Sequence, residues 1–300
     1  MPASLRFSII IPTRNRVSML DRCLAALERI DYPGSDFEVL VIDDGSDIPL
    51  SDVIDRHSAS LAIRYYRSDG QGPARARNLG LSCARGDYVV FTDDDCIPQC
   101  DWLTAFDAAF KSAPDAGFGG RIVDAPENNI YGRASQMLIT FLYKGFARHP
   151  DLTFFCSNNL AFPRRRLMQL GGFDETFPRA AGEDRELCAR WNQMYQLRFL
   201  PGAVVRHHQM LDFRSFSHQH FRYGVGGAHF WSKKAAAGEA GVKVKSVDFY
   251  WQMITFPFSA EKRLSAFTLS SLLLVSQVAN MAGYLAGRIR TGRELRSTVD

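Results

Sequence analysis

Apolar runs and amphipathic stretches alternate along the first 125 residues of the chain. Each of four runs is almost entirely apolar or β-branched, as expected of strands that are covered on both faces of a sheet. The stretches between them suit helices, so the pattern is typical of βαβ units. It predicts an α/β fold in which a mainly parallel sheet is flanked by helices, with strands at residues 7–11, 37–42, 61–66 and 88–92.

The clearest helix is predicted to begin at Ser18. Ser18 and Asp21 have the spacing of a capping box, which satisfies backbone N–H groups at the start of a helix. The apolar residues that follow recur every three or four positions, so they fall on one face of that helix. These residues are Leu20, Cys23, Leu24 and Leu27.

The pattern weakens beyond residue 125. Residues 128–150 are rich in aromatic side chains without a clean period, and we expect mixed helix and loop there. Regularity returns with a strand near residues 160–162, a charged helix over residues 183–195, and a strand over residues 197–205 that ends in two histidines. We expect these elements to complete one domain over residues 1–235 and a helical appendage to follow over residues 236–300.

The appendage contains a segment without charged side chains, residues 264–287. The segment is long enough for a membrane-spanning helix, although serine, threonine, glutamine and asparagine residues interrupt it. Positive charge on both sides gives no orientation for a single span and favours a helix that lies in a membrane interface or pairs with itself. A buried helix of the fold is the alternative. The flanking basic residues are Lys262, Arg263, Arg288, Arg290, Arg293 and Arg296.

Composition narrows the class of protein. With 46% hydrophobic and 23% charged residues among 300, the chain has ordinary globular usage, which excludes disordered, collagen-like and coiled-coil proteins. The net charge of +4 is not the single-sign excess of a nucleic-acid binder, so no nucleic-acid partner is expected. It is compatible with anionic ligands or lipid headgroups.

The cysteines and the N-terminus suggest a compartment. None of the six cysteines forms a C-x-x-C pair, which fits reduced cytosolic thiols better than a zinc or redox site. The apolar run at residues 7–11 is too short for the core of a signal peptide. We therefore expect the catalytic part to be cytoplasmic.

Two strands end in acidic residues. The second strand runs into VLVIDDGSD and leaves Asp43 and Asp44 at its carboxyl end, where open α/β sheets bind ligands. A carboxylate there can accept hydrogen bonds from a base or a ribose hydroxyl, and Gly45 allows a tight turn. The same letters are also an ordinary turn composition, so from spacing alone a turn is favoured over a site.

The fourth strand ends in YVVFTDDDC, which places Asp93, Asp94 and Asp95 side by side. Three adjacent carboxylates repel one another and need a counter-cation. Oxygen ligands suit Mg²⁺ or Mn²⁺ that bridges to substrate phosphates. A solvated acidic turn is the alternative, and the second acidic strand end in the same sheet argues against it.

Two enzyme classes can be compared with these motifs. A dinucleotide-binding dehydrogenase carries G-x-G-x-x-G after its first strand, whereas this chain has PTRNR there, so that class is excluded. An aspartyl-nucleophile phosphatase places an Asp-x-Asp pair after a strand, as Asp93 and Asp95 are placed. That class remains an alternative, although it leaves the second acidic strand end without a role and lacks a convincing downstream lysine motif. A non-catalytic sugar-nucleotide-binding module is a further alternative.

Five sequence blocks occur in a fixed order: SIIIPTRNR, VLVIDDGSD, GPARARNLGL with GDYVVFTDDDC, GGFDETFPRAAGEDRELCARW, and AVVRHH with RYGVGG. Together they resemble the inverting, nucleotide-sugar-dependent glycosyltransferases of family 2, which have the GT-A fold. The resemblance runs from residue 7 to about residue 228. It implies a nucleotide-binding half over residues 1–125 and an acceptor half over residues 126–235.

The resemblance also implies a donor site. Either Asp43 or Asp44 would read the base, while Asp93 would contact ribose and Asp95 the metal, Mn²⁺ or Mg²⁺. Cys96 departs from the family pattern, in which another acid is common. Gly72 opens a helix whose amino end favours anions, and beside it Asn78 is ranked above Arg75 and Arg77, which could equally be solvated. The remaining residues of the implied nucleotide-sugar site are Pro12, Thr13, Arg14 and Asp94.

The acceptor side of the resemblance rests on GEDRELCAR. Glu183 and Asp184 open a helix and gain from its positive end, and the resemblance makes Asp184 the catalytic base. Two acids that merely favour a helix start are the alternative. His207 matches the V-x-H element as a possible metal ligand, whereas His208 is expected to pack or cap. Arg222, in RYGVGG, could assist from a mobile loop.

The function implied is transfer of a sugar from a nucleoside-diphosphate sugar, with UDP favoured by family habit, to a hydroxyl acceptor. The acceptor would be a saccharide or lipid-linked molecule in the synthesis of cell envelope, exopolysaccharide or glycolipid. We expect the protein at the inner face of the cell membrane, held to anionic lipid by residues 264–287.

Overall fold

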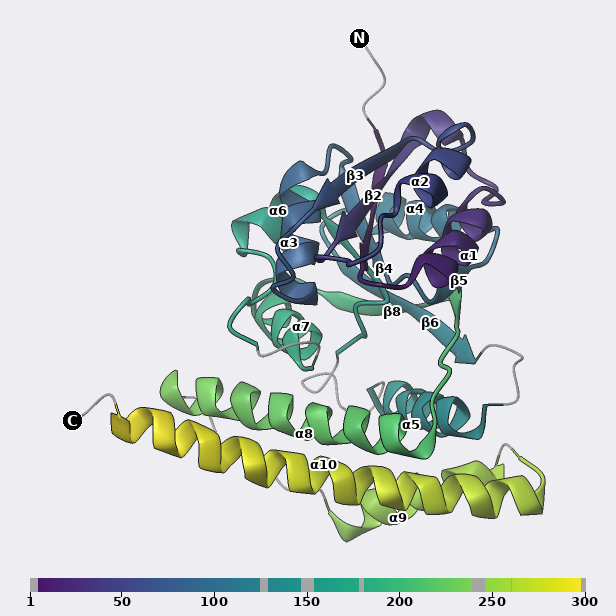
Figure 1. The fold of residues 1–300 in the computed structure, drawn as a ribbon. Helices are drawn as coiled ribbons and strands as arrows, with labels where there is room; N and C mark the ends of the chain where they lie inside the picture. Colours follow the sequence, from purple (N-terminus) through teal and green to yellow (C-terminus); the bar gives the residue numbers. More distant parts are fainter. Residues whose placement is uncertain are drawn as a thin grey trace. The chain divides into compact units, whose positions relative to one another are not determined.

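The computed structural model describes residues 5–124, 129–146, 154–177, 181–238, 246–259 and 261–297. The chain forms two units, and the first is built around an eight-stranded sheet (Figure 1). This unit comprises residues 1–125, 150–179 and 183–208. The strand order is β3-β2-β1-β4-β7-β6-β8-β5. The strands are β1 (Phe7–Thr13), β2 (Phe37–Asp43), β3 (Ile63–Arg67), β4 (Tyr88–Thr92), β5 (Cys96–Pro98), β6 (Gly117–Asp124), β7 (Asn159–Pro163) and β8 (Leu197–His207).

The four strands predicted in the first 125 residues are confirmed. Strands β3, β2, β1 and β4 are parallel neighbours, and every residue of β1, β2 and β4 is buried. Strand β7 runs antiparallel to both β4 and β6, and β8 runs parallel to β6. The predicted mainly parallel sheet is therefore correct, with β7 and β5 as its antiparallel members.

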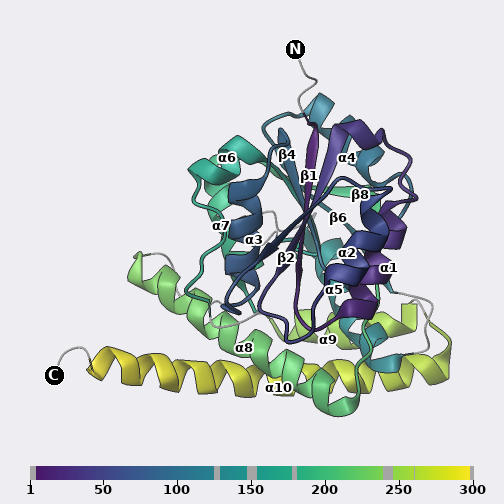
Figure 2. The same ribbon diagram turned by 45° about the horizontal axis from the view of Figure 1, so that its top comes forward.

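Helices cover both faces of this sheet (Figure 2). Strands that are buried on both faces need such cover, and the amphipathic stretches provide it. One set contains α1 (Val17–Leu27), α2 (Ser51–Ser58) and α4 (Trp102–Ser112). The other contains α3 (Pro73–Cys83), α6 (Arg164–Gln169) and α7 (Glu183–Met194), and a short 3₁₀ turn, η1 (Gly34–Asp36), precedes β2.

Helix α1 confirms the predicted apolar face but not its predicted cap. Leu20, Cys23, Leu24 and Leu27 are buried, as expected. The capping box is wrong, because α1 already begins at Val17 and, within the described residues, its first turn has no side-chain cap. Asp21 instead pairs with Arg56 and His57 of α2.

Strand β6 was missed because it is rich in glycine. A Cβ added at Gly119 would lie 1.9 Å from the Phe155 ring, and one at Gly120 would lie 2.2 Å from Asn159. Close packing thus requires residues that weaken the apolar signal of a strand. Strand β5 has only three residues, too few for a periodic pattern.

The second unit comprises residues 126–149, 180–182 and 209–300, and within the described part it is helical. Helix α5 (Ile130–Phe146) replaces the predicted mixture of helix and loop; residues 128 and 147–150 lie outside the described residues. The other elements are α8 (Phe213–Ala236), α9 (Val247–Thr255), the 3₁₀ turn η3 (Phe256–Ser259) and α10 (Arg263–Ser297).

Helices α8 and α10 approach each other closely through glycines. A Cβ at Gly224 would lie 1.9 Å from the carbonyl oxygen of Asn280, and one at Gly283 would lie 1.9 Å from that of Phe221. The RYGVGG segment is therefore a helix-packing surface. The expectation that it forms a mobile loop around Arg222 is wrong, since Arg222 lies within α8. The predicted domain boundary at residue 235 stays a prediction; α8 belongs to the second unit.

Candidate active site

The parallel strands bring both acidic segments to one edge of the sheet. Because β1, β2 and β4 are parallel neighbours, Thr13, Asp43 and the residues after Thr92 lie at the same carboxyl edge. Strand β8 adds His207 by pairing, since its register with β5 sets His207 opposite Cys96. A histidine more than 100 residues away in the chain thus lies beside the acidic triplet Asp93–Asp95.

Neutral hydrogen-bond donors hold the two carboxylates at the end of β2. Asp43 is fully buried and accepts from the backbone N–H of Ser46 and the hydroxyl of Tyr65, both at 2.7 Å. Asp44 accepts from Ser68 Oγ and from the backbone N–H of Gly72, both at 3.0 Å. Each carboxylate therefore shapes the loops at this edge, and base recognition by either stays a prediction.

Arginines hold the acidic triplet after β4. Arg77 Nη2 lies 2.8 Å from Asp93 Oδ1. Arg16 Nη1 lies 3.1 Å from Asp94 Oδ1 and 2.8 Å from Asp95 Oδ2. The repulsion expected among these carboxylates is thus offset in part by guanidinium groups of the chain itself.

The three carboxylates are not equivalent. Burial raises the pKa of Asp94 to about 6, although Arg16 and a 2.7 Å hydrogen bond from Thr13 Oγ1 oppose this. Burial acts in the same direction on Asp95, but His207 and Arg16 outweigh it and lower its pKa to about 2. Asp95 is consequently held in its charged form more strongly than Asp94.

Asp95, Cys96 and His207 form a group with metal-ligand geometry, in which their ligand atoms lie within 4.8 Å of one another. His207 Nε2 is 3.2 Å from Asp95 Oδ1. Burial raises the pKa of the Cys96 thiol well above its usual value, and sulfur is a softer ligand than Mg²⁺ or Mn²⁺ prefers. A carboxylate and an imidazole remain, a donor set that fits a divalent cation completed by substrate oxygens and water.

Asn158 supports the imidazole of His207. Its Nδ2 lies 3.4 Å from His207 Nδ1, and its buried Oδ1 has no hydrogen-bond partner among the described residues. An amide beside Nδ1 can orient the ring through whichever of its ends matches the tautomer. With its Oδ1 turned to the ring, the amide would accept the proton on Nδ1 and leave Nε2 for a metal; with its Nδ2 there, it would donate to an unprotonated Nδ1.

The two acids at the start of α7 differ in their surroundings. Glu183 is buried and its Oε1 lies 3.1 Å from Arg77 Nη1, so its charge is compensated. Asp184 accepts a hydrogen bond from the Arg185 backbone N–H at 2.7 Å. Burial, reinforced by the negative charge of Glu183, raises the pKa of Asp184 to about 7. A carboxyl group that titrates near neutrality is suited to general base catalysis.

Arg77 is the residue that links the two acidic groups. It is 3% exposed and bridges Asp93 at the end of β4 to Glu183 at the start of α7. Of the two readings left open for Arg77, the solvated one is therefore wrong, whereas Arg75 is solvent-exposed, its side chain 54% accessible. The sequence held a signal for this, because Arg77 shares the buried face of α3 with Ala74 and Leu81.

Other predicted site residues lie at the same edge without joining the triplet. Asn78 exchanges two 2.8 Å hydrogen bonds with the backbone of Phe173, so its amide fixes that loop. Pro12 is buried at the end of β1, and Arg14 is exposed with its guanidinium near Gly70. Gly72 has φ +101° at the start of α3, a conformation that favours glycine. A nucleotide-binding role for these residues stays a prediction.

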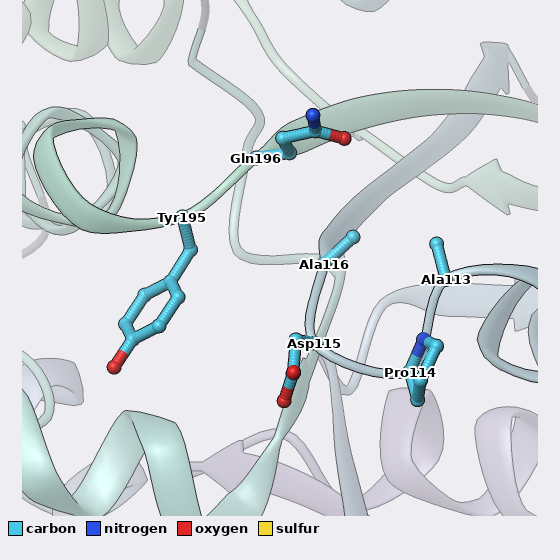
Figure 3. A pocket seen from close by; sticks show the side chains of 6 residues that line it. All are labelled: Ala113, Pro114, Asp115, Ala116, Tyr195 and Gln196. Carbon is cyan, nitrogen blue, oxygen red and sulfur yellow. The ribbon is translucent and has the colours of Figure 1, made fainter.

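A cavity of about 190 Å³ lies elsewhere in the same unit (Figure 3). Its lining residues immediately precede β6 and β8, whereas His207 is at the far end of β8. Asp115 at its rim is paired with Arg166. The cavity therefore contains none of the predicted site residues; its lining is Ala113, Pro114, Asp115, Ala116, Tyr195 and Gln196.

Residues 8–171 match the family model described as "Glycosyl transferase family 2", which covers more than half of the chain. The pre-mycofactocin glycosyltransferase of Mycobacterium tuberculosis is 29% identical over 231 residues, 74% of this chain and 47% of that protein. The hyaluronan synthase of Pasteurella multocida is 30% identical over 219 residues, 61% of this chain and 22% of that protein. The chain spans about half the length of these curated relatives, or less.

Two solved structures share the fold. The mannosyltransferase PcManGT from Pyrobaculum calidifontis, in complex with GDP-Man and Mn²⁺, has a TM-score of 0.62 at 19% identity, covering 93% of this chain and 88% of that chain. S. aureus TarS 1–349 in complex with UDP-GlcNAc has a TM-score of 0.58 at 16% identity, covering 96% and 92%. The predicted GT-A fold is confirmed by these likenesses.

Proposed function

The chain belongs to glycosyl transferase family 2, and on that premise we propose that it transfers a sugar from a nucleoside-diphosphate sugar to a hydroxyl group, with inversion at the anomeric carbon. UDP is the carrier we favour. The acceptor we propose is a saccharide or a lipid-linked molecule of the cell envelope. Family membership argues against the phosphatase alternative.

One observation carries this proposal: within a single unit, Arg77 joins an acidic triplet beside a metal-ligand group to Glu183, whose neighbour Asp184 has a pKa near neutrality. The first group suits a diphosphate, and the second suits an acceptor hydroxyl. A donor and an acceptor must meet for direct transfer, and this arrangement brings the two kinds of chemistry together.

Asp95 and His207 would hold the divalent cation in this proposal, and imidazole ligation favours Mn²⁺ over Mg²⁺. A bound metal supplies Lewis-acid neutralisation of the charge on the departing nucleoside diphosphate. The likeness to a mannosyltransferase solved with GDP-Man and Mn²⁺ is consistent with this choice.

Asp184 would act as the base. Its carboxylate takes the proton from the acceptor hydroxyl while the hydroxyl oxygen forms a bond to the anomeric carbon. The bond from that carbon to the phosphate oxygen breaks on the opposite face, and its electrons leave with the nucleoside diphosphate. Glu183 forms an ion pair with Arg77 and lies beside Asp184, and its negative charge adds to the effect of burial in raising the pKa of Asp184.

A thermal-shift screen of nucleoside diphosphates with and without Mn²⁺ tests the donor class. We expect UDP to raise the Tm only when Mn²⁺ is present. A phosphatase would instead hydrolyse simple phosphate esters and lose that activity on Asp93→Asn. Nucleotide binding without detectable transfer to any hydroxyl acceptor would support the non-catalytic module.

We also propose that helix α10 holds the protein at the cytoplasmic face of an anionic membrane, where a lipid-linked acceptor would be presented. Residues Arg263–Arg290 form a helix long and apolar enough to cross a membrane, with a third of its apolar window buried. Large apolar side chains on its other face are exposed and recur at intervals of three, four or seven: Leu264, Phe267, Leu274, Val278, Met281 and Leu285.

Charge favours a membrane over a second copy as the occupant of this apolar face. Lys262 and Arg263 precede the face and Arg288 and Arg290 follow it, so two α10 helices paired in either direction would oppose basic ends. An anionic surface attracts both ends, at about 1 kcal/mol for each basic residue near the headgroups. Exposed apolar area adds to this attraction.

Flotation with phosphatidylglycerol vesicles tests the location. We expect the double variant Leu274→Ser with Val278→Ser to float much less than wild type. The matched control replaces two exposed apolar residues of the first unit, Ile48→Ser with Met194→Ser, and should float normally. Equal flotation of both variants, or a wild-type protein that ignores the vesicles, would contradict the proposal; concentration-dependent dimerisation lost only in the first variant would show a second copy instead.

A further inference from the structure

Arg16 lies at the turn between β1 and α1, and the turn fixes its direction. Asn15, just before it, has φ 56°, a left-handed conformation that is uncommon outside glycine. The Asn15 backbone N–H donates to Ser46 Oγ at 2.9 Å, and its side chain exchanges hydrogen bonds with Asp47 at 2.8 and 2.7 Å. This strained but well-bonded turn presents Arg16 to the acidic triplet.

The guanidinium of Arg16 lies beside the carboxylates whose negative charge a bound metal would need. It lies 2.8 Å from Asp95 Oδ2 and 3.1 Å from Asp94 Oδ1, while His207 faces the other oxygen of Asp95. A guanidinium has no lone pair to offer and keeps its charge, so it cannot become a ligand. A divalent cation on Asp95 and Arg16 in its present position therefore repel each other.

The two arginines on the triplet differ in their freedom to move. The side chain of Arg77 is 4% exposed and is fixed between Asp93 and Glu183. The side chain of Arg16 is 53% exposed, and both of its carboxylate partners lie on the triplet. The Arg16 side chain can therefore turn toward solvent or toward a phosphate without breaking an ion pair outside the triplet.

We propose that Arg16 is an internal counter-cation, which neutralises Asp94 and Asp95 in the metal-free protein and is displaced when a divalent cation binds. The inference rests on the proposed metal-dependent donor site. While it is paired with Asp94 and Asp95, Arg16 competes with the metal and so weakens metal binding. Once displaced, its guanidinium is available to a diphosphate oxygen, so that metal and donor favour each other's binding.

The direct test measures Mn²⁺ affinity without nucleotide, by calorimetry or by electron paramagnetic resonance of free Mn²⁺. We expect Arg16→Gln to bind Mn²⁺ at least tenfold more tightly than wild type. Arg56→Gln removes an exposed arginine paired with Asp21 and serves as the matched control, with wild-type affinity. A merely structural arginine would lower stability on replacement but would not raise metal affinity.

Each other outcome is decisive. Equal or weaker Mn²⁺ binding by Arg16→Gln overturns the role of Arg16 and leaves the donor site standing. Absence of Mn²⁺ binding in both proteins overturns the metal site itself, and the inference with it.

A second measurement uses the wild-type protein, so it does not depend on a variant that folds. In ¹⁵N-arginine spectra, titration with diamagnetic Mg²⁺ should shift the Nε–H resonance of Arg16, while that of Arg77 moves far less. A saturating titration that leaves the Arg16 resonance unmoved would contradict displacement.

Discussion

The acidic residues at the end of β4 and those at the start of α7 lie in one unit and share Arg77, yet they are held in different states. The Asp95 carboxylate faces Arg16 and His207, and its pKa falls to about 2. Asp184 is partly buried, and burial together with the negative charge of Glu183 raises its pKa to about 7. The comparison shows that the balance between burial and contact with cations decides whether an aspartate stays charged or accepts protons near neutrality.

The end of β2 adds a third case. Asp43 and Asp44 accept hydrogen bonds from neutral groups of the loop after β2, of β3 and of the segment that follows β3. The same sequence signal, two or three aspartates after a buried strand, thus produces a turn braced by hydrogen bonds at the end of β2 and a cluster held by ion pairs at the end of β4. At the end of β4, Arg16, Arg77 and His207 lie within 3.2 Å of the carboxylates, whereas at the end of β2 Arg67 approaches Asp43 only to 3.8 Å.

Replacing Arg77, which contacts both acidic groups, is expected to have the largest effect. Arg77→Met leaves Glu183 buried without a counter-charge and frees Asp93, which should lower the free energy of unfolding by about 3–5 kcal/mol. Urea denaturation measures this. Arg75→Met, on the same helix but exposed, is the control and should change stability by less than about 1 kcal/mol. A similar effect of both variants would show that the buried bridge is unimportant.

Replacing the carboxyl group of Asp184 should abolish acceptor activation while leaving donor binding intact. Asp184→Asn cannot take a proton from the acceptor, so turnover should fall ~100-fold or more. Binding of UDP with Mn²⁺ should stay at the wild-type level, because the triplet is untouched. Steady-state kinetics and calorimetry on the same preparation measure both. Loss of donor binding together with turnover would place Asp184 on the donor side.

The pH dependence of transfer should sharpen the comparison. Asp184 must be deprotonated to act as a base, and its pKa is raised, so the rate should fall as the pH drops below about 7, tenfold for each unit. Asp95 stays charged throughout this range because its pKa is about 2. Burial lowers the pKa of His207 but Asp95 raises it more, so protons compete with the metal for His207, and donor binding is measured in parallel to separate its loss from loss of the base. Profiles of kcat/KM and of UDP affinity at constant Mn²⁺ measure the two. A flat kcat/KM between pH 5 and 8 would exclude Asp184 as the base.

The sequence predicted the strands best where burial on both faces selects mostly apolar residues, as in β1 and β2. It failed where close packing removes side chains, at the glycines of β6, and where a three-residue strand is too short for a pattern. The α1 cap failed because the turn at Asn15 starts the helix earlier than Ser18. These errors have a common cause, because the features depend on tertiary contacts that the local sequence does not indicate.

The sequence predicted the acidic residues of the candidate site, but it did not predict the arginines that pair with them. Asp93–Asp95 could be found because acids after a strand are a local signal, whereas Asp184 was named through the resemblance to family 2, since two acids at a helix start are also an ordinary capping pattern. Arg77 could have been found from the buried face of α3. Arg16 had no such signal, because its contact with the triplet depends on the pairing of β1 with β4. Asn158 likewise reaches His207 only through the fold.

The most direct test of a metal-dependent donor side and a separate acceptor side is calorimetric titration of UDP into wild type, Asp95→Asn and Asp184→Asn, each with Mn²⁺ and with EDTA. An amide cannot replace the anionic oxygen that a hard cation requires. We predict that Mn²⁺ strengthens UDP binding in wild type and in Asp184→Asn but not in Asp95→Asn. Mn²⁺-dependent binding that survives unchanged in Asp95→Asn would contradict the assignment of the metal to the end of β4.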